Sequence, residues 1–253
     1  MDRDALLAAF DAQIRRGAGN DDGVVRTVSA ADGWSGVTWS DLDGRDADAV
    51  IAAQIARFAG RPGPWEWKHY SYDRPADLPQ RLVAAGFIPE PAEALLVAEI
   101  ADLALDTPPP AGVELRQVLD AAGVAALVSV HDEVFGDDHA AVGRALLAGL
   151  AVGEPATAAG VVAFAGDVPI SAARVEFHAG TDFASLWGGG TLPAWRRRGL
   201  FRAVVAYRAR LAAARGFRYL QVDALPTSRP ILERLGFVQL ATTTPFTHPG
   251  GAG

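Results

Sequence analysis

The chain of 253 residues contains no cysteine, which excludes disulfide bonds, thiolate metal ligands and a cysteine nucleophile. It contains no apolar run that approaches the roughly 20 residues of a membrane-spanning helix. Its first residues, Met-Asp-Arg-Asp, lack the basic and then apolar pattern that opens a secretory signal peptide. We therefore expect a cytoplasmic protein with no membrane partner.

Lysine is nearly absent, because Lys68 is the single lysine among 23 basic residues. The formal net charge of −7 is also distributed unevenly: residues 1–111 carry 18 acidic and 10 basic residues, whereas residues 112–253 carry 12 and 13. Eight arginines and no acidic residue fall within residues 194–218. This arginine cluster is the feature that a function has to explain.

Half of the residues are hydrophobic and 21% are charged, a balance that favours folded structure over disorder. The length suits one large domain or two small ones. The clearest boundary is residues 106–112, Asp-Thr-Pro-Pro-Pro-Ala-Gly, because consecutive prolines favour an extended linker. We therefore expect one domain over residues 1–105 and a second over residues 113–253.

Hydrophobic periodicity and turn residues predict the helices and strands. In the first domain we expect helices at Asp4–Arg16, Asp46–Phe58 and Leu78–Ala85, and strands at Val24–Val28, Gly36–Ser40, Trp65–Ser71 and Ala94–Ile100. In the second we expect helices at 121–135 (capped by Asp120), Ala140–Val152, Leu200–Arg215 and Arg229–Leu235, and strands at Val113–Val118, Ala158–Ala165, Ile170–His178, Phe183–Thr191, Tyr219–Ala224 and Phe237–Thr243. This order predicts a mixed α/β (α+β) fold.

The two domains share a sequence echo. Residues 78–87 and residues 228–237 each follow a strand, form a short helix and end in Gly-Phe before another strand. The echo indicates that both halves descend from one unit, and a coincidental Gly-Phe at a helix end is the alternative.

Residues 191–202, Thr-Leu-Pro-Ala-Trp-Arg-Arg-Arg-Gly-Leu-Phe-Arg, lie where a strand gives way to a helix. The N-terminus of a helix presents unpaired N–H groups and partial positive charge, and therefore binds phosphate. Arginine side chains pair with phosphate oxygens in a bidentate manner. Neither a P-loop nor a Gly-x-Gly-x-x-Gly motif is present, so we expect a polyphosphate ligand other than a P-loop nucleotide.

This segment resembles the signature of the GNAT superfamily, the acyl-CoA-dependent N-acyltransferases, which reads Gln/Arg-x-x-Gly-x-Gly/Ala after a strand and usually follows a proline. Residues 196–201, with Pro193 ahead of them, match in all but the last position, where Phe201 stands. Residues 232–237 resemble the family's terminal helix and Gly-Phe. The resemblance implies a mixed, mostly antiparallel twisted sheet flanked by helices. It also implies a tandem of one truncated unit without a CoA motif and one complete unit.

The resemblance further implies that the strand ending at Gly189, Gly190 and Thr191 splays from its neighbour and binds the pantetheine arm of acetyl-CoA or another acyl-CoA. The pyrophosphate would lie on the segment that follows, formed by Arg196, Arg197, Arg198, Gly199, Leu200, Phe201 and Arg202. The remaining arginines of the cluster, Arg208, Arg210, Arg215 and Arg218, extend along the helix and past its end, where we expect them only to solvate it.

Catalytic residues do not carry over from the family directly. Many members have a carboxylate on the strand before the CoA loop and a tyrosine on the last helix, whereas this sequence has Ser185 and Leu232. We expect Glu176, which would pair across from Ser185, to serve as the base, with a solvated strand residue as the alternative. Ser228 either donates to the departing thiolate or caps a helix. Three further residues compete for the role of base: His178, Asp223 and His248.

The acceptor amine would lie near the end of the first helix of the second domain. Asp132, Glu133 or His131 would attract a cationic amine, although exposed helix-end charges explain the two acids equally. Trp187 either forms a wall of the pantetheine channel or fills the core. The five histidines show no metal-ligand spacing, so we expect no metal.

We therefore expect an N-acyltransferase, monomeric or homodimeric, that uses a CoA thioester and an amine acceptor without a covalent acyl-enzyme. A non-catalytic acyl-CoA sensor is the alternative, since the usual tyrosine and strand carboxylate are missing. Nucleic-acid binding by the arginine cluster is a third interpretation, opposed by the acidic charge of the whole chain; we expect no nucleic-acid partner.

Overall fold

The computed structural model describes residues 2–16, 22–28, 34–61, 63–136, 138–153 and 156–250. By their contacts, the residues form two compact units. The first comprises Met1–Leu96, Asp223–Pro230 and Gln239–Gly253, and the second comprises Val97–Val222 and Ile231–Val238. The compact units thus divide elsewhere than at residues 106–112, because most of the C-terminal strand belongs to the first unit. The domains expected at 1–105 and 113–253 stay a proposal about the repeated units.

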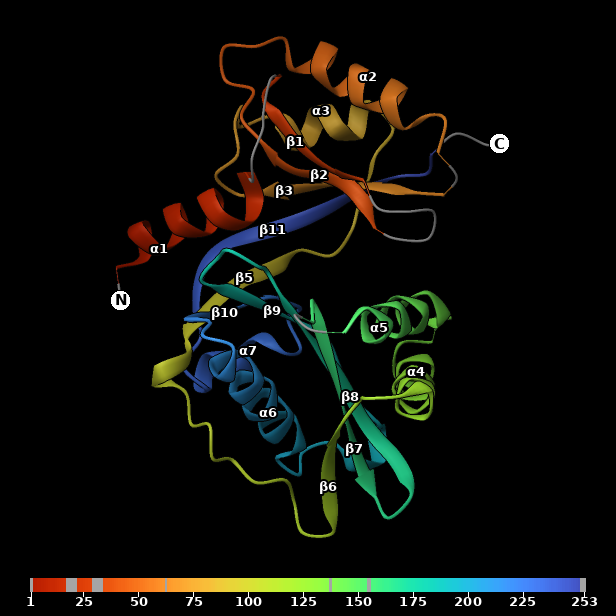
Figure 1. Ribbon diagram of the computed structural model, residues 1–253. Coiled ribbons are helices and arrows are strands. Elements are labelled where there is room, and N and C mark those ends of the chain that lie inside the picture. The colour runs from red at the N-terminus through yellow and green to blue at the C-terminus, as the bar shows by residue number, and fades with distance from the viewer. Residues whose placement is uncertain are drawn as a thin grey trace. The chain divides into compact units, whose positions relative to one another are not determined.

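The first unit is a sheet covered by two helices. Its strands β1 (Val24–Val28), β2 (Ser35–Ser40), β3 (Trp65–Tyr70) and β11 (Val238–His248) pair in that order, and β4 (Ile88–Pro89) pairs with β11. Helices α2 (Ala47–Phe58) and α3 (Leu78–Ala84) pack on one face (Figure 1). Their apolar residues enclose an aromatic core in which Phe58 stacks on Trp65, with ring centroids 4.3 Å apart. Strand β5 (Glu93–Glu99) runs from the first unit into the second.

Two of the expected elements in the first unit need correction. The expected helix Asp4–Arg16 is an α-helix, α1, only over Arg3–Phe10, and it continues as a π-helix, η1, over Asp11–Arg16. The last strand does not stop at Thr243 but runs to His248, because Thr243–His248 pair with β3 across the sheet. Pro245 suggests the end of a strand, and this long-range pairing overrides that signal.

The second unit is a sheet with helices on both faces. Its strands pair in the order β10 (Tyr219–Ala224), β9 (Phe183–Thr191), β8 (Val168–Phe177), β7 (Ala158–Ala165) and β6 (Val113–Gln117). Helices α4 (Ala121–Phe135) and α5 (Ala140–Val152) cover one face, and α6 (Leu200–Ala214) covers the other (Figure 1). Asp120 caps α4 as expected, since its carboxylate accepts from the N–H of Gly123. Short helices η2 (Ile100–Asp102), η3 (Pro193–Trp195) and α7 (Arg229–Arg234) complete the fold.

The expected fold class is confirmed. Strands β2 and β3, which α2 connects, pair in parallel, and so do β9 and β10, which α6 connects. The other pairs described above are antiparallel. Each unit therefore contains a strand–helix–strand crossover that is followed by a short helix and Gly-Phe.

The Gly-Phe element itself is a helix terminator. The N–H of Phe87 donates to Leu82 O, and the N–H of Phe237 donates to Leu232 O, across a glycine with positive φ in both cases. The same bond ends α6, where Phe217 donates to Ala212 O. A C-terminal glycine in the left-handed region is a common way to end a helix. The shared crossover, rather than Gly-Phe, therefore supports a repeated unit.

Candidate functional site

The connection from β9 to α6 leaves a helix N-terminus uncapped. Gly199 is the N-cap residue, with φ 81°, and among the described residues no side chain bonds to the N–H groups of the first turn. Arg197 has φ 62° and is the one non-glycine residue with positive φ in the described chain. Left-handed residues close together turn successive N–H groups inwards and form an anion-binding concavity. A left-handed arginine costs roughly 1–3 kcal/mol, a strain that is typical of functional sites.

The arginine side chains around this turn are exposed and have no acidic partner. Arg196 donates to the carbonyl oxygen of Thr191 at 2.9 Å, and the guanidinium of Arg198 lies 4.8 Å from the centroid of the Trp195 ring. No carboxylate in the described chain forms an ion pair with these two residues or with Arg197 or Arg202. The positive charge at the start of α6 is therefore available to an anion.

Strand β9 separates from β10 partway along its length, as expected. The parallel ladder joins Phe183, Ala184 and Ser185 to Tyr219, Leu220 and Gln221 and ends there. On its other edge, β9 stays paired with β8 as far as Thr191. The backbone edge of β9 after Ser185 is thus free of β10 and leads to the start of α6.

Three glycines let helices approach β9 closely on both sides. A Cβ on Gly188 would lie 2.7 Å from the His131 ring of α4, and one on Gly190 would lie 3.0 Å from Val134 of the same helix. A Cβ on Gly189 would lie 3.3 Å from Phe201 of α6. Because these three positions carry no side chain, helices α4 and α6 pack directly against the backbone of β9.

Arg208 is not a solvating residue, and that expectation is wrong. Only 2% of Arg208 is exposed. Its guanidinium donates to the carbonyl oxygens of Arg174 and Trp187, which face each other at an irregularity in the β8–β9 pairing. Burial, with the charge of Arg174, lowers the pKa of Arg208 to about 9. The irregular pairing leaves these two carbonyls without backbone donors, and Arg208 supplies the missing hydrogen bonds. Such a contact between distant parts of the chain has no local sequence signal.

The remaining arginines of the cluster also make specific contacts. Arg210 donates to the carbonyl oxygen of Leu105, and Arg218 pairs with Glu99 at 3.0 Å. Arg215 lies over the Phe177 ring. Half of the cluster thus stabilises the fold, and the other half surrounds the start of α6.

Glu176 lies across from Ser185, as expected from the hairpin. Its carboxylate forms an ion pair with Arg174 at 3.1 Å, and its side chain is 36% exposed. Ser228 belongs to the first compact unit, and its hydroxyl donates to the carbonyl oxygen of Leu225 at 3.2 Å. No helix N–H in the described chain bonds to that hydroxyl.

Ser185 belongs to a buried hydrogen-bond chain that the sequence did not reveal. Its Oγ lies 2.7 Å from His178 Nε2 and donates to Gln221 Oε1 at 2.7 Å. Burial lowers the pKa of His178 below its usual 6.5, and the nearby carboxylate of Glu176 opposes that change. Ser185 and Gln221 come from β9 and β10, and His178 directly follows the end of β8, so only the pairing of the strands brings the three residues together.

The expected acceptor residues separate into structural and exposed groups. Asp132 accepts hydrogen bonds from the backbone N–H of His139 at 2.9 Å and lies 3.1 Å from its ring, which ties the end of α4 to the start of α5. Glu133 is exposed. Trp187 is 37% exposed and therefore does not fill the core.

His131, the third candidate residue on α4, contacts the backbone of β9. It is 1% exposed, its ring lies against Gly188, and burial lowers its pKa to about 4. The ring is therefore neutral at pH 7. The sequence named His131 as a candidate to attract a cationic amine, whereas the structure places its ring on the buried, apolar face of α4.

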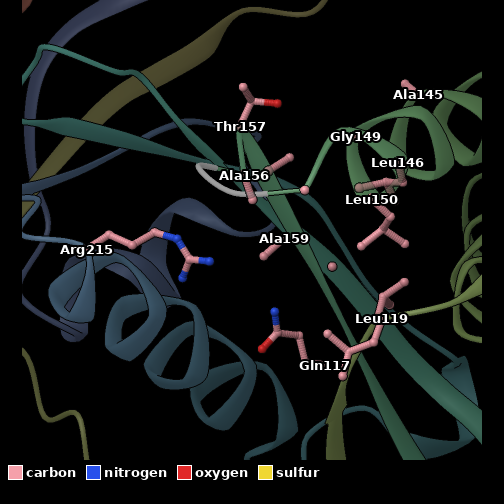
Figure 2. Close-up of a pocket in the computed structure, with 14 residues that line it drawn as sticks. Gln117, Leu119, Ala145, Leu146, Gly149, Leu150, Ala156, Thr157, Ala159 and Arg215 are labelled. Carbon is pink, nitrogen blue, oxygen red and sulfur yellow. The ribbon is translucent and has the colours of Figure 1, made fainter.

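A pocket of about 180 Å³ is lined by residues of α5 and β7 and by Arg215 (Figure 2). Leu119, Leu146 and Leu150 form its apolar side, and Gln117 and Arg215 contribute polar groups. None of the expected site residues lines it. Within the described ranges, no group of three or more histidine, aspartate or glutamate residues is arranged to hold a metal. The same ranges contain no helix long and apolar enough to span a membrane.

Comparison with solved structures identifies the fold. A GCN5-related N-acetyltransferase from Kribbella flavida matches with a TM-score of 0.71 at 22% identity, covering 98% of this chain and 95% of that one. A conserved protein of unknown function from Staphylococcus epidermidis matches with a TM-score of 0.66 at 14% identity, over 95% and 97%. A tandem GNAT protein from the clavulanic acid biosynthesis pathway matches with a TM-score of 0.62 at 14% identity, over 91% and 79%.

No protein-family profile matches the chain, and no curated protein matches it in sequence. The expected resemblance to the GNAT superfamily is confirmed at the level of the fold, including its tandem form. Identities below 25% leave the reaction and its substrates to be argued from the site.

Proposed function

We propose that the protein is an N-acyltransferase that moves an acetyl or other acyl group from acyl-CoA directly to an amine. The observation that carries the proposal is the uncapped start of α6, where Arg197 and Gly199 are left-handed and four exposed arginines lack acidic partners. The free edge of β9 leads to this point. An extended arm that ends in a pyrophosphate fits both features.

The corresponding helix of the first unit supports the assignment by contrast. Helix α2 also connects two parallel strands, but Asp46 caps it and accepts from the N–H of Ala49 at 3.1 Å. A carboxylate at a helix N-terminus already occupies the groups that a phosphate would use. We therefore propose a single CoA site, in the second unit.

In this proposal the N–H groups from Arg197 to Arg202 hold the pyrophosphate, with the side chains of Arg196, Arg198 and Arg202 around it. The edge of β9 at Gly189, Gly190 and Thr191 pairs with the amides of the pantetheine arm. No metal takes part. Hydrogen bonds between ionised groups contribute about 1.5–3 kcal/mol each, so several arginines together give useful affinity for CoA.

Acyl transfer requires a neutral amine and a stabilised thiolate. Glu176 is the proposed carboxylate beside the reacting centre, where it either takes up the proton, directly or through water, or acts through the neighbouring His178. Trp187 is proposed to form a wall of the channel, and Asp132 and Glu133 to supply negative charge for a cationic acceptor.

The test is release of free CoA from acetyl-CoA in the presence of benzylamine, spermidine, amino acids and short peptides. We expect turnover with at least one class, and we expect Glu176→Gln to lower the turnover rate while calorimetry gives unchanged CoA affinity. Unchanged turnover in this variant would refute the role of Glu176.

A non-catalytic acyl-CoA sensor is the second candidate. It is favoured by Leu232, a buried apolar residue where the family's tyrosine would stand, and by the ion pair that engages Glu176. Tight CoA binding without turnover on any amine would support the sensor. The third interpretation, nucleic-acid binding, predicts salt-sensitive DNA or RNA binding that CoA does not displace. Burial of Arg208 and pairing of Arg218 interrupt the basic track that it needs.

A further inference from the structure

The chain His178–Ser185–Gln221 has a defined direction. Gln221 presents its carbonyl oxygen to Ser185, and a carbonyl oxygen only accepts, so the Ser185 hydroxyl donates its single proton to Gln221. The contact of 2.7 Å between Ser185 Oγ and His178 Nε2 is then a bond in which the ring nitrogen donates. His178 therefore carries its proton on Nε2, and the lone pair of the neutral ring is on Nδ1.

The same direction removes Ser185 as a nucleophile. A serine is activated when a histidine nitrogen accepts its proton. Here the imidazole donates to the serine and the serine donates to an amide. The chain instead fixes the orientation and tautomer of His178.

The position of the chain connects it to the proposed reaction. Ser185 and Gln221 are the last partners in the ladder between β9 and β10, and the free edge of β9 begins directly after them. An arm that binds along this edge from the start of α6 ends near this point. His178 is partly buried, and its Nδ1 has no partner among the residues that the structure describes.

We propose that His178 is the base of the acyl transfer and that Ser185 and Gln221 are positioning residues that hold it in the Nε2–H tautomer. The inference rests on the proposed function and assigns the proton-accepting step within it. The amine nitrogen forms a bond to the acyl carbon, the C–S bond breaks, and its electron pair leaves as the CoA thiolate. The proton lost by nitrogen moves to Nδ1, and the imidazolium returns it to the thiolate or to water.

Glu176 then acts through His178. Its carboxylate is the charged group that acts on this ring, while Ser185 and Gln221, from the neighbouring strands, are neutral. A nearby carboxylate stabilises the imidazolium that forms when the proton is transferred. Glu176 is a positioning residue in this scheme.

The decisive kinetic experiment measures kcat and kcat/KM against pH for the panel amine that turns over fastest. The wild-type enzyme should lose activity on the acid side with an inflection below pH 6.5. His178→Gln should remove that inflection and lower kcat by about 100-fold or more, the usual contribution of a general base. His178→Gly should regain activity with added imidazole. A retained inflection in His178→Gln, or no rescue, would overturn the assignment.

Two further measurements separate this role from a structural one. Histidine ¹⁵N spectra of the free protein should show His178 as the Nε2–H tautomer, and Gln221→Leu should disturb that preference while CoA affinity is unchanged. Spectra showing the Nδ1–H tautomer, or an acyl group on Ser185 found by mass spectrometry, would contradict the proposal.

The rival histidine provides the matched control. His248 also has a lowered pKa through burial, and His248→Gln should leave the acid inflection in place. Loss of the inflection in that variant would move the base to His248. A wild-type enzyme that binds CoA and shows the Nε2–H tautomer but turns over no amine would refute the proposed function and the base assignment, while leaving the hydrogen-bond chain intact.

Discussion

The ring of His131 lies directly against the backbone of Gly188, so closely that a Cβ at position 188 would come within 2.7 Å of it. Gly188 also has φ 58°, a conformation that side-chain-bearing residues rarely adopt. Because Arg174 and Trp187 expose carbonyls to Arg208 at this same segment, the irregular course of β9 depends on helices from both faces of the sheet.

We expect Gly188→Ala to lower the free energy of unfolding by roughly 2–4 kcal/mol, since left-handed strain and overpacking each cost about 1–3 kcal/mol. Gly180→Ala is the matched control, because Gly180 has φ 77° but a Cβ added to it would meet no atom within 4 Å. Urea unfolding of both variants isolates the clash with His131. Equal losses of unfolding free energy in the two variants would mean that the His131 ring moves aside without an energetic penalty.

Acidification should weaken the second unit through His131. Burial holds the pKa of His131 at about 4 in the folded protein, against 6.5 when unfolded, so the unfolded state binds more protons between these values. The contribution is complete above pH 6.5 and is lost as the pH falls towards 4, by about 3 kcal/mol. Urea unfolding at pH 7, 5.5 and 4.5 measures this loss of unfolding free energy. In His131→Gln, the part of the pH dependence that comes from His131 should be absent. A variant with the wild-type pH dependence would refute this linkage.

The arginines at the start of α6 should contribute to CoA affinity, and those further along the helix and past its end should not. Arg202→Ala is expected to weaken CoA binding by about tenfold or more, because its side chain lies at the proposed pyrophosphate site and a charge-assisted hydrogen bond contributes about 1.5–3 kcal/mol. Arg218→Ala, which breaks the ion pair with Glu99, should leave the affinity within about twofold. Calorimetry at two salt concentrations measures both, and equal losses would indicate a diffuse electrostatic effect.

The single lysine should be essential to the first unit. Lys68 Nζ lies 2.8 Å from Asp223 Oδ2 and 3.4 Å from Glu93 Oε2, and both members of the closer pair are largely buried. Lys68→Met leaves these carboxylates without a counterion, and removing one partner of a buried pair costs about 3–5 kcal/mol. Lys68→Met/Asp223→Leu should recover part of the loss in thermal unfolding. No recovery would assign the loss to packing of the lysine stem.

Most of the helices and strands can be predicted from local sequence patterns. Periodicity and turn residues located β1, α5, β7, β9 and β10 at their observed bounds, because amphipathic patterns and glycine stops act within a few residues of the chain. The proposed phosphate-binding segment also has a local signal, since an arginine run with a glycine stands at a strand–helix junction.

Only the tertiary structure decided how the side chains combine. The cluster of eight arginines divides into exposed residues at the start of α6 and residues such as Arg208, which is buried against the irregular pairing of β8 and β9. Ser185 of β9, Gln221 of β10 and His178, which directly follows β8, meet because these strands pair in the observed register. Pairing across a sheet joins residues far apart in the chain, and no local pattern encodes which partners face each other. The arginine composition therefore pointed to the proposed anion site, and the sheet register produced the buried hydrogen-bond chain.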